Sequence, residues 1–542
     1  MEDRNSVIIH RQGIVVWLTL AAFGVMGLFP VVAVAQAMDL SFLTTRAEAT
    51  DYQETTRYDE AIGFLEVAAA QSSDLHLTTF GYTGEGRALP LVIWGTDHPD
   101  SGAILEDGRT RIFIQANIHG GEVCGKEAML ALIRDLAAGR YDHWKDSVIL
   151  LIAPIYNADG NERVSLYNRP RQYGPVGGMG QRPNAADLDL NRDHMKLASP
   201  EARSLVQVMS TYDPEVLVDL HTTNGTRHGY HLTYSPPLNP NTAPSIDGLL
   251  RNEVLPKITS VIKEKYGWDF YYYGNLPFRG DEPGWYTFDH RPRFNNNYVG
   301  LRNRVAILSE AYSYASFKER VLASRAFVEE VITYVVTHPG DIRDAISEAE
   351  AVDLVGLPFA VRAEHKRSEA PVDILMGGAN QERNPYSGAP MLVRTDESRV
   401  ESMYEYGTFQ ATETVLLPQA YIIPPGLRGV SDMLDDHGIT YSRVEGQRSL
   451  MVEEFRIDST NVAGREFQGV KERTLFGQYL STQKTVEAGA LWVPVAQPLG
   501  RLLAYLVEAR SDDGLVTWGK LEAALSTAAT YPILRVPATD RP

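Results

Sequence analysis

Runs of apolar residues alternate with amphipathic stretches over the first two thirds of the chain. Short apolar runs bounded by polar or turn residues are typical of buried strands, and longer periodic stretches are typical of helices. The predicted strands are Leu91–Trp94, Ile112–Ala116, Val148–Ala153, Val216–Leu220 and Val305–Ser309. The predicted helices are Ala128–Ala137, a helix that follows Ser199-Pro200-Glu201, and a helix from about Ala315 to Val336. Strands that alternate with helices predict an α/β fold.

The pattern changes after Val352. Short β-rich runs (Leu357–Val361, Val400–Thr408 and Thr414–Ile422) stand between clusters of Pro, Gly and Asn, with one short helix over Val430–His437. We therefore predict two domains, 45–351 and 356–542, of which the second is smaller and β-rich.

An apolar run from Gly13 to Ala35 follows Arg4 and Arg11 and leads into small residues that offer A-x-A frames ending at Ala35 or Ala37. A basic start, an apolar stretch and a small-residue exit are typical of a secretory signal peptide. An uncleaved anchor is the alternative, because the run could span a bilayer. We predict that residues 1–37 are a signal peptide, that the protein is exported to the periplasm or the exterior, and that it has no membrane contact after cleavage.

The composition excludes several classes of protein and of metal site. With 44% hydrophobic and 22% charged residues the chain can bury a large core, which excludes a disordered chain. The formal net charge of −18 argues against a nucleic-acid partner. A single cysteine, Cys124, excludes an internal disulfide framework and any Cys-rich metal site.

Polar residues follow four of the predicted strands directly, at His119–Glu122, Asn157–Gly160, His221–Thr223 and Glu310. Ligands of an open α/β sheet bind outside the carboxyl ends of its strands, so these four segments could meet in one pocket.

His119 and Glu122 form the only H-x-x-E among the thirteen histidines. Such a match arises easily by chance, and Glu122 could simply cap a helix. A tight Gly-Gly turn would instead let both side chains point the same way. Zn²⁺ accepts imidazole and carboxylate ligands, and three protein ligands leave one position for water. We therefore predict one zinc ion bound by His119, Glu122 and His221.

These residues and five segments of the chain resemble the zinc carboxypeptidases of the M14 (carboxypeptidase A/B-like) family. The resemblance covers about residues 50–340. It rests on the order and spacing of motifs that are similar to the family's: Gly81–Arg87, Asn157–Gly160, Asp187–Asp193, Asp219–His221 and Ile307–Glu310. The resemblance implies a mixed central sheet of about eight strands flanked by helices.

The resemblance also implies a metallocarboxypeptidase acting on peptides with a free C-terminal carboxylate. The zinc would lower the pKa of its bound water, and Glu310 would be the general base and catalytic residue. Asn191 and Arg192 resemble the pair that grips the terminal carboxylate. Asp189 resembles the carboxylate that orients the first histidine ligand.

Two roles have several candidates. The family has an arginine that stabilises the oxyanion of the scissile carbonyl. Arg163, Arg169 and Arg171 compete for it, and we favour Arg171. For the tyrosine that closes over the substrate, Tyr298 is the nearest candidate, although it lies closer to Glu310 than the family interval, so Tyr286 stays open.

The sequence leaves the substrate open between peptides and other amides such as murein stem peptides, because family resemblance fixes chemistry better than substrate. An inactive scaffold whose C-terminal domain binds a partner is the non-enzyme alternative. The oligomeric state and the role of residues 356–542 are open.

Overall fold

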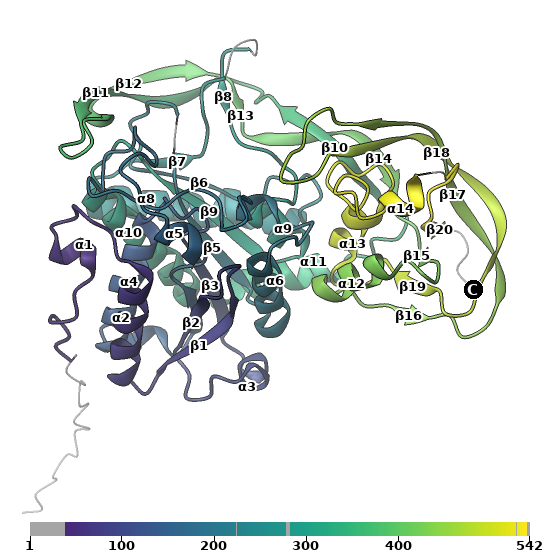
Figure 1. The fold of residues 1–542 in the computed structure, drawn as a ribbon, viewed down its shortest axis with the longest axis horizontal. Coiled ribbons are helices and arrows are strands. Elements are labelled where there is room, and N and C mark those ends of the chain that lie inside the picture. Colours follow the sequence, from purple (N-terminus) through teal and green to yellow (C-terminus); the bar gives the residue numbers. More distant parts are fainter. Residues whose placement is uncertain (1–37, 224, 278–281, 527, 539–542) are drawn as a thin grey trace, which may run out of the picture. The chain divides into compact units, whose positions relative to one another are not determined.

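A computed structural model describes residues 38–223, 225–277, 282–526 and 528–538 (Figure 1). The predicted signal peptide, residues 1–37, lies outside the described residues. No helix of the described ranges is long and apolar enough to cross a membrane.

An eight-stranded mixed sheet forms the centre of the N-terminal half, residues 38–351, and confirms the predicted fold class. Its strand order is β1-β2-β4-β3-β5-β9-β6-β7. Strands β4, β3, β5 and β9 run parallel in the middle, while β2 is antiparallel to β4, and β6 is antiparallel to β9. The strands are β1 (Leu75–Tyr82), β2 (Ala88–Trp94), β3 (Thr110–Ala116), β4 (Val148–Ala153), β5 (Val216–Thr222), β6 (Leu232–Ser235), β7 (Phe270–Tyr272) and β9 (Val305–Ala311).

Helices cover both faces of this sheet (Figure 1). The helices of this half are α1 (Arg46–Ala49), α2 (Tyr58–Ala70), α3 (Ser101–Glu106), α4 (Cys124–Ala137), α5 (Ala158–Glu162), α6 (Pro200–Tyr212), α7 (Pro244–Leu249), α8 (Leu255–Tyr266), α9 (Asn295–Leu301), α10 (Phe317–Thr337) and α11 (Pro339–Ala351). Successive strand residues point to opposite faces. Ile112 and Ile114 of β3 thus join the apolar cluster of α2, α4, α8 and α10, whereas Phe113 joins a second cluster with α6 and α9.

The C-terminal half, residues 356–538, is β-rich, as predicted. Its main sheet has the order β16-β19-β15-β20-β17-β18. Two further antiparallel pairs are β10 with β14 and the hairpin β11–β12, which lies against the N-terminal half, where Met376 bridges to His228 (Figure 1). The elements are β10 (Pro358–Lys366), β11 (Val372–Arg383), β12 (Pro390–Met403), β13 (Glu405–Tyr406), β14 (Thr408–Leu416), β15 (Ala420–Ile423), α12 (Arg428–His437), β16 (Ser442–Arg443), β17 (Arg448–Val462), β18 (Arg473–Val486), β19 (Leu491–Pro494), α13 (Gly500–Val507), α14 (Glu522–Leu525) and β20 (Leu534–Val536).

The second apolar cluster continues from α6 and α9 into the C-terminal half, where it includes Leu434, Leu503 and Leu506. Strand β13 also pairs with β8 (Trp285–Tyr286) of the N-terminal half. The two halves therefore share a core. The predicted boundary between two domains at 351–356 remains a proposal.

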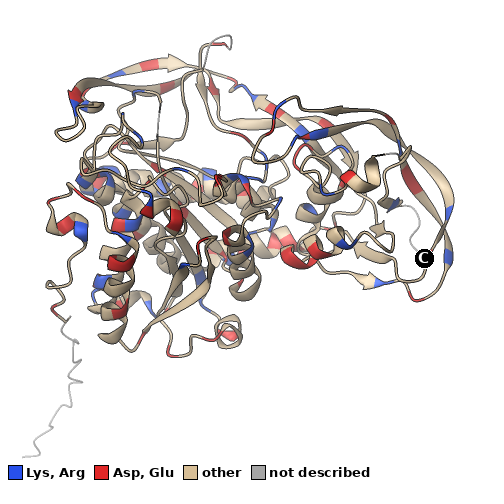
Figure 2. Cartoon of the chain, viewed as in Figure 1, with Lys and Arg blue, Asp and Glu red and all other residues tan. Residues whose placement is uncertain are grey.

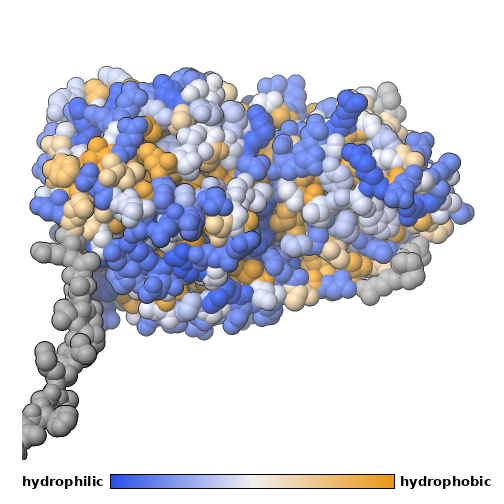
Figure 3. All heavy atoms as spheres, turned by 90° about the horizontal axis from the view of Figure 1, so that it is seen from below, coloured by the Kyte–Doolittle hydropathy of each residue, from blue (hydrophilic) through white to orange (hydrophobic). Residues whose placement is uncertain are grey.

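Charged residues of both signs are interspersed along the helices and the long strands (Figure 2). The face of the molecule seen from below is mostly hydrophilic, with apolar atoms in patches between the polar ones (Figure 3).

A buried histidine links the halves and makes stability depend on pH. The ring Nδ1 of His437 lies 2.9 Å from the hydroxyl of Tyr298, and Arg302 donates to the His437 carbonyl at 2.9 Å. Burial lowers the pKa of His437 to about 3, and the charge of Arg302 acts in the same direction. Between pH 6.5 and 3, His437 is therefore protonated in the unfolded chain and neutral in the folded chain.

Stability should fall as the pH falls below about 6.5, by roughly 1 kcal/mol per pH unit from this group. Urea unfolding of His437→Gln, which cannot take up the proton, should show a pH dependence that is smaller by that amount. Equal slopes for the variant and the wild-type chain would contradict this assignment.

Candidate active site

The four polar segments predicted from the sequence lie together at the carboxyl edge of the central strands. Because β3, β4, β5 and β9 are neighbours and parallel, their carboxyl ends share one edge of the sheet. His221 and Glu310 are register partners on β5 and β9, so both stand at this edge.

The segment from Asn117 to Glu122 turns sharply between β3 and α4. Asn117 adopts a left-handed backbone with φ of 64°, and its side-chain amide donates to the His119 and Gly120 carbonyls. Asparagine tolerates this conformation better than most residues. The Glu122 amide then donates to the His119 carbonyl at 2.9 Å, which brings both side chains to one side of the turn.

Close packing explains the two glycines of this turn. A Cβ at Gly120 would collide with the backbone at Gly160, and a Cβ at Gly121 would lie 2.5 Å from the Gly180 carbonyl oxygen. The His-Gly-Gly-Glu sequence thus allows the turn to lie directly against two other loops.

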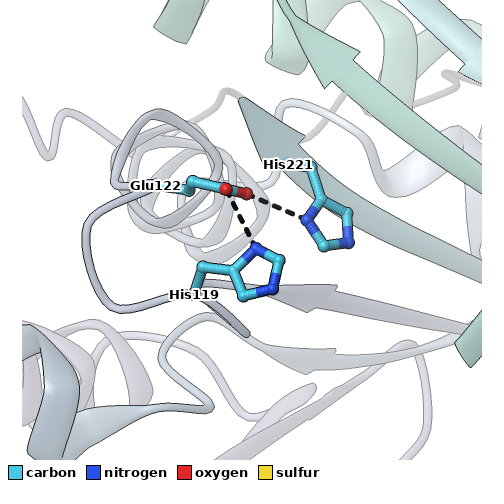
Figure 4. Close-up of side chains that lie close together, drawn as sticks. All are labelled: His119, Glu122 and His221. Atoms are coloured by element: carbon cyan, nitrogen blue, oxygen red, sulfur yellow. Dashed lines mark hydrogen bonds and ion pairs between the residues drawn. The ribbon is translucent and has the colours of Figure 1, made fainter. Parts of the chain in front are cut away.

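His119, Glu122 and His221 form one buried cluster (Figure 4). Their ligand-capable atoms all lie within 4.8 Å of one another. The Nδ1 atom of His119 is 2.9 Å from Glu122 Oε1, and the Nδ1 atom of His221 is 2.9 Å from Glu122 Oε2. Two imidazole nitrogens and one carboxylate, all facing a common point, form a donor set that suits Zn²⁺.

Two further carboxylates hold the outer nitrogens of these rings. His119 Nε2 lies 3.0 Å from Asp189 Oδ1, and His221 Nε2 lies 3.0 Å from Asp219 Oδ2. A carboxylate on one ring nitrogen fixes the tautomer that leaves the other nitrogen free for a metal.

The protonation of the two histidine rings indicates whether a cation fits between them and Glu122. If each Nε2 donates its hydrogen to an aspartate, each Nδ1 presents a lone pair to a Glu122 oxygen at 2.9 Å. Two acceptors at that distance repel each other unless positive charge lies between them. The residues present therefore fit a bound cation.

The pKa shifts agree with this conclusion. Burial opposes ionisation of Glu122, yet the nearby Arg169 and His119 hold its pKa well below the usual value. Burial likewise opposes protonation of His221, but Asp219 and Glu122 raise its pKa well above the usual value. The site thus favours positive charge among ionised carboxylates.

Glu310 stands beside this cluster with a free acceptor. Its Oε2 is buried and has no hydrogen-bond partner among the described residues. Burial raises the pKa of its carboxyl to about 8, although the charge of His221 acts against this. A half-buried acid that has one enclosed oxygen with no hydrogen-bond partner among the described residues, beside a candidate metal site, is suited to exchange protons there.

His119, Glu122, His221 and Glu310 line a cavity of about 170 Å³, together with Asn191 and Arg192. The Arg192 guanidinium lies 3.8 Å from the centre of the Phe294 ring and donates to the Asn191 carbonyl at 2.7 Å. Burial lowers its pKa to about 10. A guanidinium has five donors, so others remain for an anion in the cavity.

Asp193, next in sequence, faces away from this cavity lining. It is fully buried and binds Lys196 Nζ at 2.5 Å and the amides of Ala198 and Ser199. Its charge therefore organises the turn before α6.

The three candidate arginines have different surroundings. Arg163 pairs with Glu85 at the surface. Arg171, which we favoured, is exposed, and its carbonyl accepts from Leu392. Arg169 has a left-handed backbone with φ of 46°, and its Nη2 lies 2.5 Å from Glu122 Oε1. Of the three, Arg169 reaches the cluster.

The candidate tyrosines do not line the cavity. Tyr298 is 1% exposed and its hydroxyl contacts His437, because α9 directs it into the core. Tyr286 stacks on Tyr406 with ring centres 4.0 Å apart. The tyrosine that lines the cavity is Tyr273, whose hydroxyl accepts from Asn275.

Two of the sequence motifs, Gly81–Arg87 and Asn157–Gly160, contact each other through Asp159, and we call this contact the clamp. Asp159 is fully buried and accepts hydrogen bonds from the Thr83 hydroxyl, the Glu85 amide and Arg87, at 2.7, 3.0 and 2.7 Å. The clamp fixes the loop after β4 beside the His119 turn.

Sequence reasoning missed several residues at the site. Asp219 had a signal, because residues two apart on a strand share a face and His221 follows it at that spacing. Arg182 binds Asp189 through Nε and Nη2 at 3.0 and 2.8 Å, and it had no signal in its own segment. The same is true of Phe288 and Phe294, which line the cavity.

Comparison with known proteins agrees with this geometry. Residues 62–242 match the family model of the zinc carboxypeptidases (Peptidase_M14). Carboxypeptidase 2 of Trichophyton tonsurans is 22% identical over 510 residues, which cover 89% of this chain and 86% of that protein. Carboxypeptidase 2 of Trichophyton rubrum is 22% identical over 512 residues, with the same coverage.

Solved structures of metallocarboxypeptidases are also similar. The metallo-carboxypeptidase from Burkholderia cenocepacia has 18% identity and a TM-score of 0.39, over 52% of this chain and 69% of that chain. The metallo-carboxypeptidase from Pseudomonas aeruginosa in complex with (2-guanidinoethylmercapto)succinic acid has 18% identity and a TM-score of 0.38, over 53% and 70%. Residues 62–242, which carry the His119 turn, His221 and the motifs between them, are thus the part of the chain that is similar to the zinc carboxypeptidase family.

Proposed function

We propose that this chain is a zinc-dependent carboxypeptidase that removes C-terminal residues from peptides. The observation that carries the proposal is one cavity lined by the His119–Glu122–His221 cluster, by Arg192 and by Glu310, whose Oε2 has no hydrogen-bond partner among the described residues. One zinc ion held by these three ligands would supply Lewis acidity, which acidifies water and polarises a carbonyl.

Glu310 is the proposed general base and acid. It would accept a proton from the attacking water and deliver it to the leaving amine. Its buried Oε2 has no competing partner among the described residues, so the proton can move to it without breaking a hydrogen bond. Asp189 and Asp219 hold the outer nitrogens of the two histidine ligands.

Arg192 and Asn191 are the proposed binding groups for the terminal carboxylate. The close contact with the Phe294 ring restricts the Arg192 side chain, and a guanidinium can bind a carboxylate in bidentate fashion. For the oxyanion we now propose Arg169 in place of Arg171, since Arg169 contacts the cluster and Arg171 is exposed.

Replacing Arg192 by Gln should raise KM for peptides with a free C-terminus and lower kcat/KM by about 10- to 100-fold, because a charge-assisted hydrogen bond contributes about 1.5–3 kcal/mol. The kcat/KM of Arg192→Lys should lie between those of the wild-type chain and Arg192→Gln, since lysine keeps the charge but not the bidentate geometry. Steady-state kinetics would measure both. Arg163→Gln, at the surface, is the control, and an unchanged KM in Arg192→Gln would contradict the assigned role.

The substrate assay compares free and amidated peptides, with murein fragments as a third arm. Preference for the free C-terminus supports the carboxypeptidase proposal. Equal rates on amidated peptides, or cleavage of murein fragments alone, would point to the amidase alternative instead. Export stays a proposal, which fractionation of expressing cells would test.

A further inference from the structure

A tight turn of the C-terminal half reaches the candidate site. Phe467 and Val470 pair as an isolated bridge between β17 and β18, with Gln468 and Gly469 at the tip. Both tip residues have positive φ, 52° and 77°, as a two-residue type I′ turn requires. Such turns favour Asn or Gly at the first position, so Gln468 holds a costly conformation. A strained residue of this kind suggests that its side chain has a function.

The side chain of Gln468 contacts the backbone of Asp189. Its Oε1 accepts the Asp189 amide hydrogen at 2.7 Å. The carboxylate of Asp189 holds His119 through one oxygen and Arg182 through the other. Gln468 therefore supports the residue that orients the first candidate ligand.

The same turn supports a second part of the site. The guanidinium of Arg293 packs against both Phe467 and Trp518, at 5.3 and 4.5 Å from their ring centres. Asp513, fully buried, accepts hydrogen bonds from the Arg293 amide and Nε at 2.6 and 2.8 Å. The residue that follows Arg293 is Phe294, on which the Arg192 guanidinium packs.

Asn295 continues this connection. Its backbone amide donates to Asn191 Oδ1 at 2.9 Å, and its side chain donates to Asp219 Oδ2 at 3.3 Å. The C-terminal half thus contacts residues that lie next to the site. Asp189 and, through Asp219, Asn295 adjoin the two candidate histidine ligands, and Phe294 and Asn295 adjoin Arg192 and Asn191.

We propose that the C-terminal half completes the active site, and that Gln468 is a positioning residue that acts on the zinc ligand His119 through Asp189. This inference rests on the proposed function. It gives residues 356–538 a role inside the catalytic centre, in addition to any role at the surface.

The test uses full-length Gln468→Asn and Gln468→Glu. Asparagine fits the left-handed position better than glutamine but is one methylene too short to reach the Asp189 amide. Glutamate keeps an oxygen acceptor of the same reach. The control, Gln478→Asn, makes the same chemical change at an exposed position of β18.

Zinc affinity, measured by competition with a chelator, should weaken about 10-fold in Gln468→Asn, at the lower end of the effect of losing an outer-shell partner. Gln468→Glu should stay within about 3-fold of the wild-type affinity. The metal-free Gln468→Asn chain should melt at or above the wild-type temperature, so loss of affinity would not follow loss of stability.

Wild-type zinc affinity in Gln468→Asn would overturn the proposal, and so would equal losses in the Asn and Glu variants. If Gln468→Asn fails to fold, Gln468→Gly, which also relieves the backbone, gives the same comparison. A wild-type chain that binds zinc but hydrolyses no peptide would refute the proposed function, while the affinity measurements still decide this inference.

Discussion

Glu310→Gln should retain zinc and lose peptidase activity. The amide has nearly the shape of the carboxylate but cannot accept the proton of the attacking water, so kcat should fall by about 10²- to 10⁴-fold, the usual contribution of general acid–base catalysis. Because Glu310 is not one of the three proposed ligands, zinc content should stay near that of the wild-type chain. Kinetics and metal analysis on the same preparation measure both.

Glu264→Gln, at an exposed position of α8, controls for the loss of a carboxylate elsewhere. Turnover within a few-fold of wild type in Glu310→Gln would show that another group moves the proton. Loss of zinc in this variant would show that Glu310 belongs to the ligand set.

His221→Ala should lose both zinc and activity. Removing an outer-shell partner typically costs 10- to 100-fold in metal affinity, so removing a direct ligand should cost more than about 100-fold. Asp219→Asn, which removes the charge that orients His221, should weaken zinc by about 10- to 100-fold. The ranking of the two variants tests whether His221 binds the metal directly and Asp219 acts through it.

His143→Ala, at an exposed position, controls for zinc that binds to surface histidines. Full zinc content in His221→Ala, after dialysis against a weak chelator, would remove His221 from the proposed site.

The sheet was predictable because each of its central strands contains a short run of mostly apolar residues that polar residues follow. Val148–Ala153 was predicted with the bounds that β4 has, and Ile112–Ala116 lies within β3. The cluster of His119, Glu122 and His221 was predictable for a related reason. His119 and Glu122 come a few residues after β3, and His221 lies at the carboxyl end of β5, so the parallel pairing of β3 with β5 brings the three together.

Residues in long loops were harder to place. Arg169 and Arg171 lie two positions apart in an irregular segment with no strand or helix to set their direction. Which one reaches Glu122 depends on the left-handed turn at Arg169, which is uncommon for an arginine. Tyr298 was near Glu310 in sequence, but α9 directs its ring into the shared core.

Contacts between distant segments had no signal in the sequence. Gln468 lies 279 residues from Asp189, and Asp513 lies 220 residues from Arg293. Each is an ordinary polar residue in its own segment, and only the packing of the two halves gives it a partner at the site.

The most direct test of the zinc site is a crystal structure of the zinc-loaded chain, with anomalous data collected at the zinc edge. We predict a single strong peak, at about 2.0–2.2 Å from Nδ1 of His119, Nδ1 of His221 and the Glu122 carboxylate. A peak held by other residues, or none at this cluster in a chain that still hydrolyses peptides, would contradict the proposed zinc site.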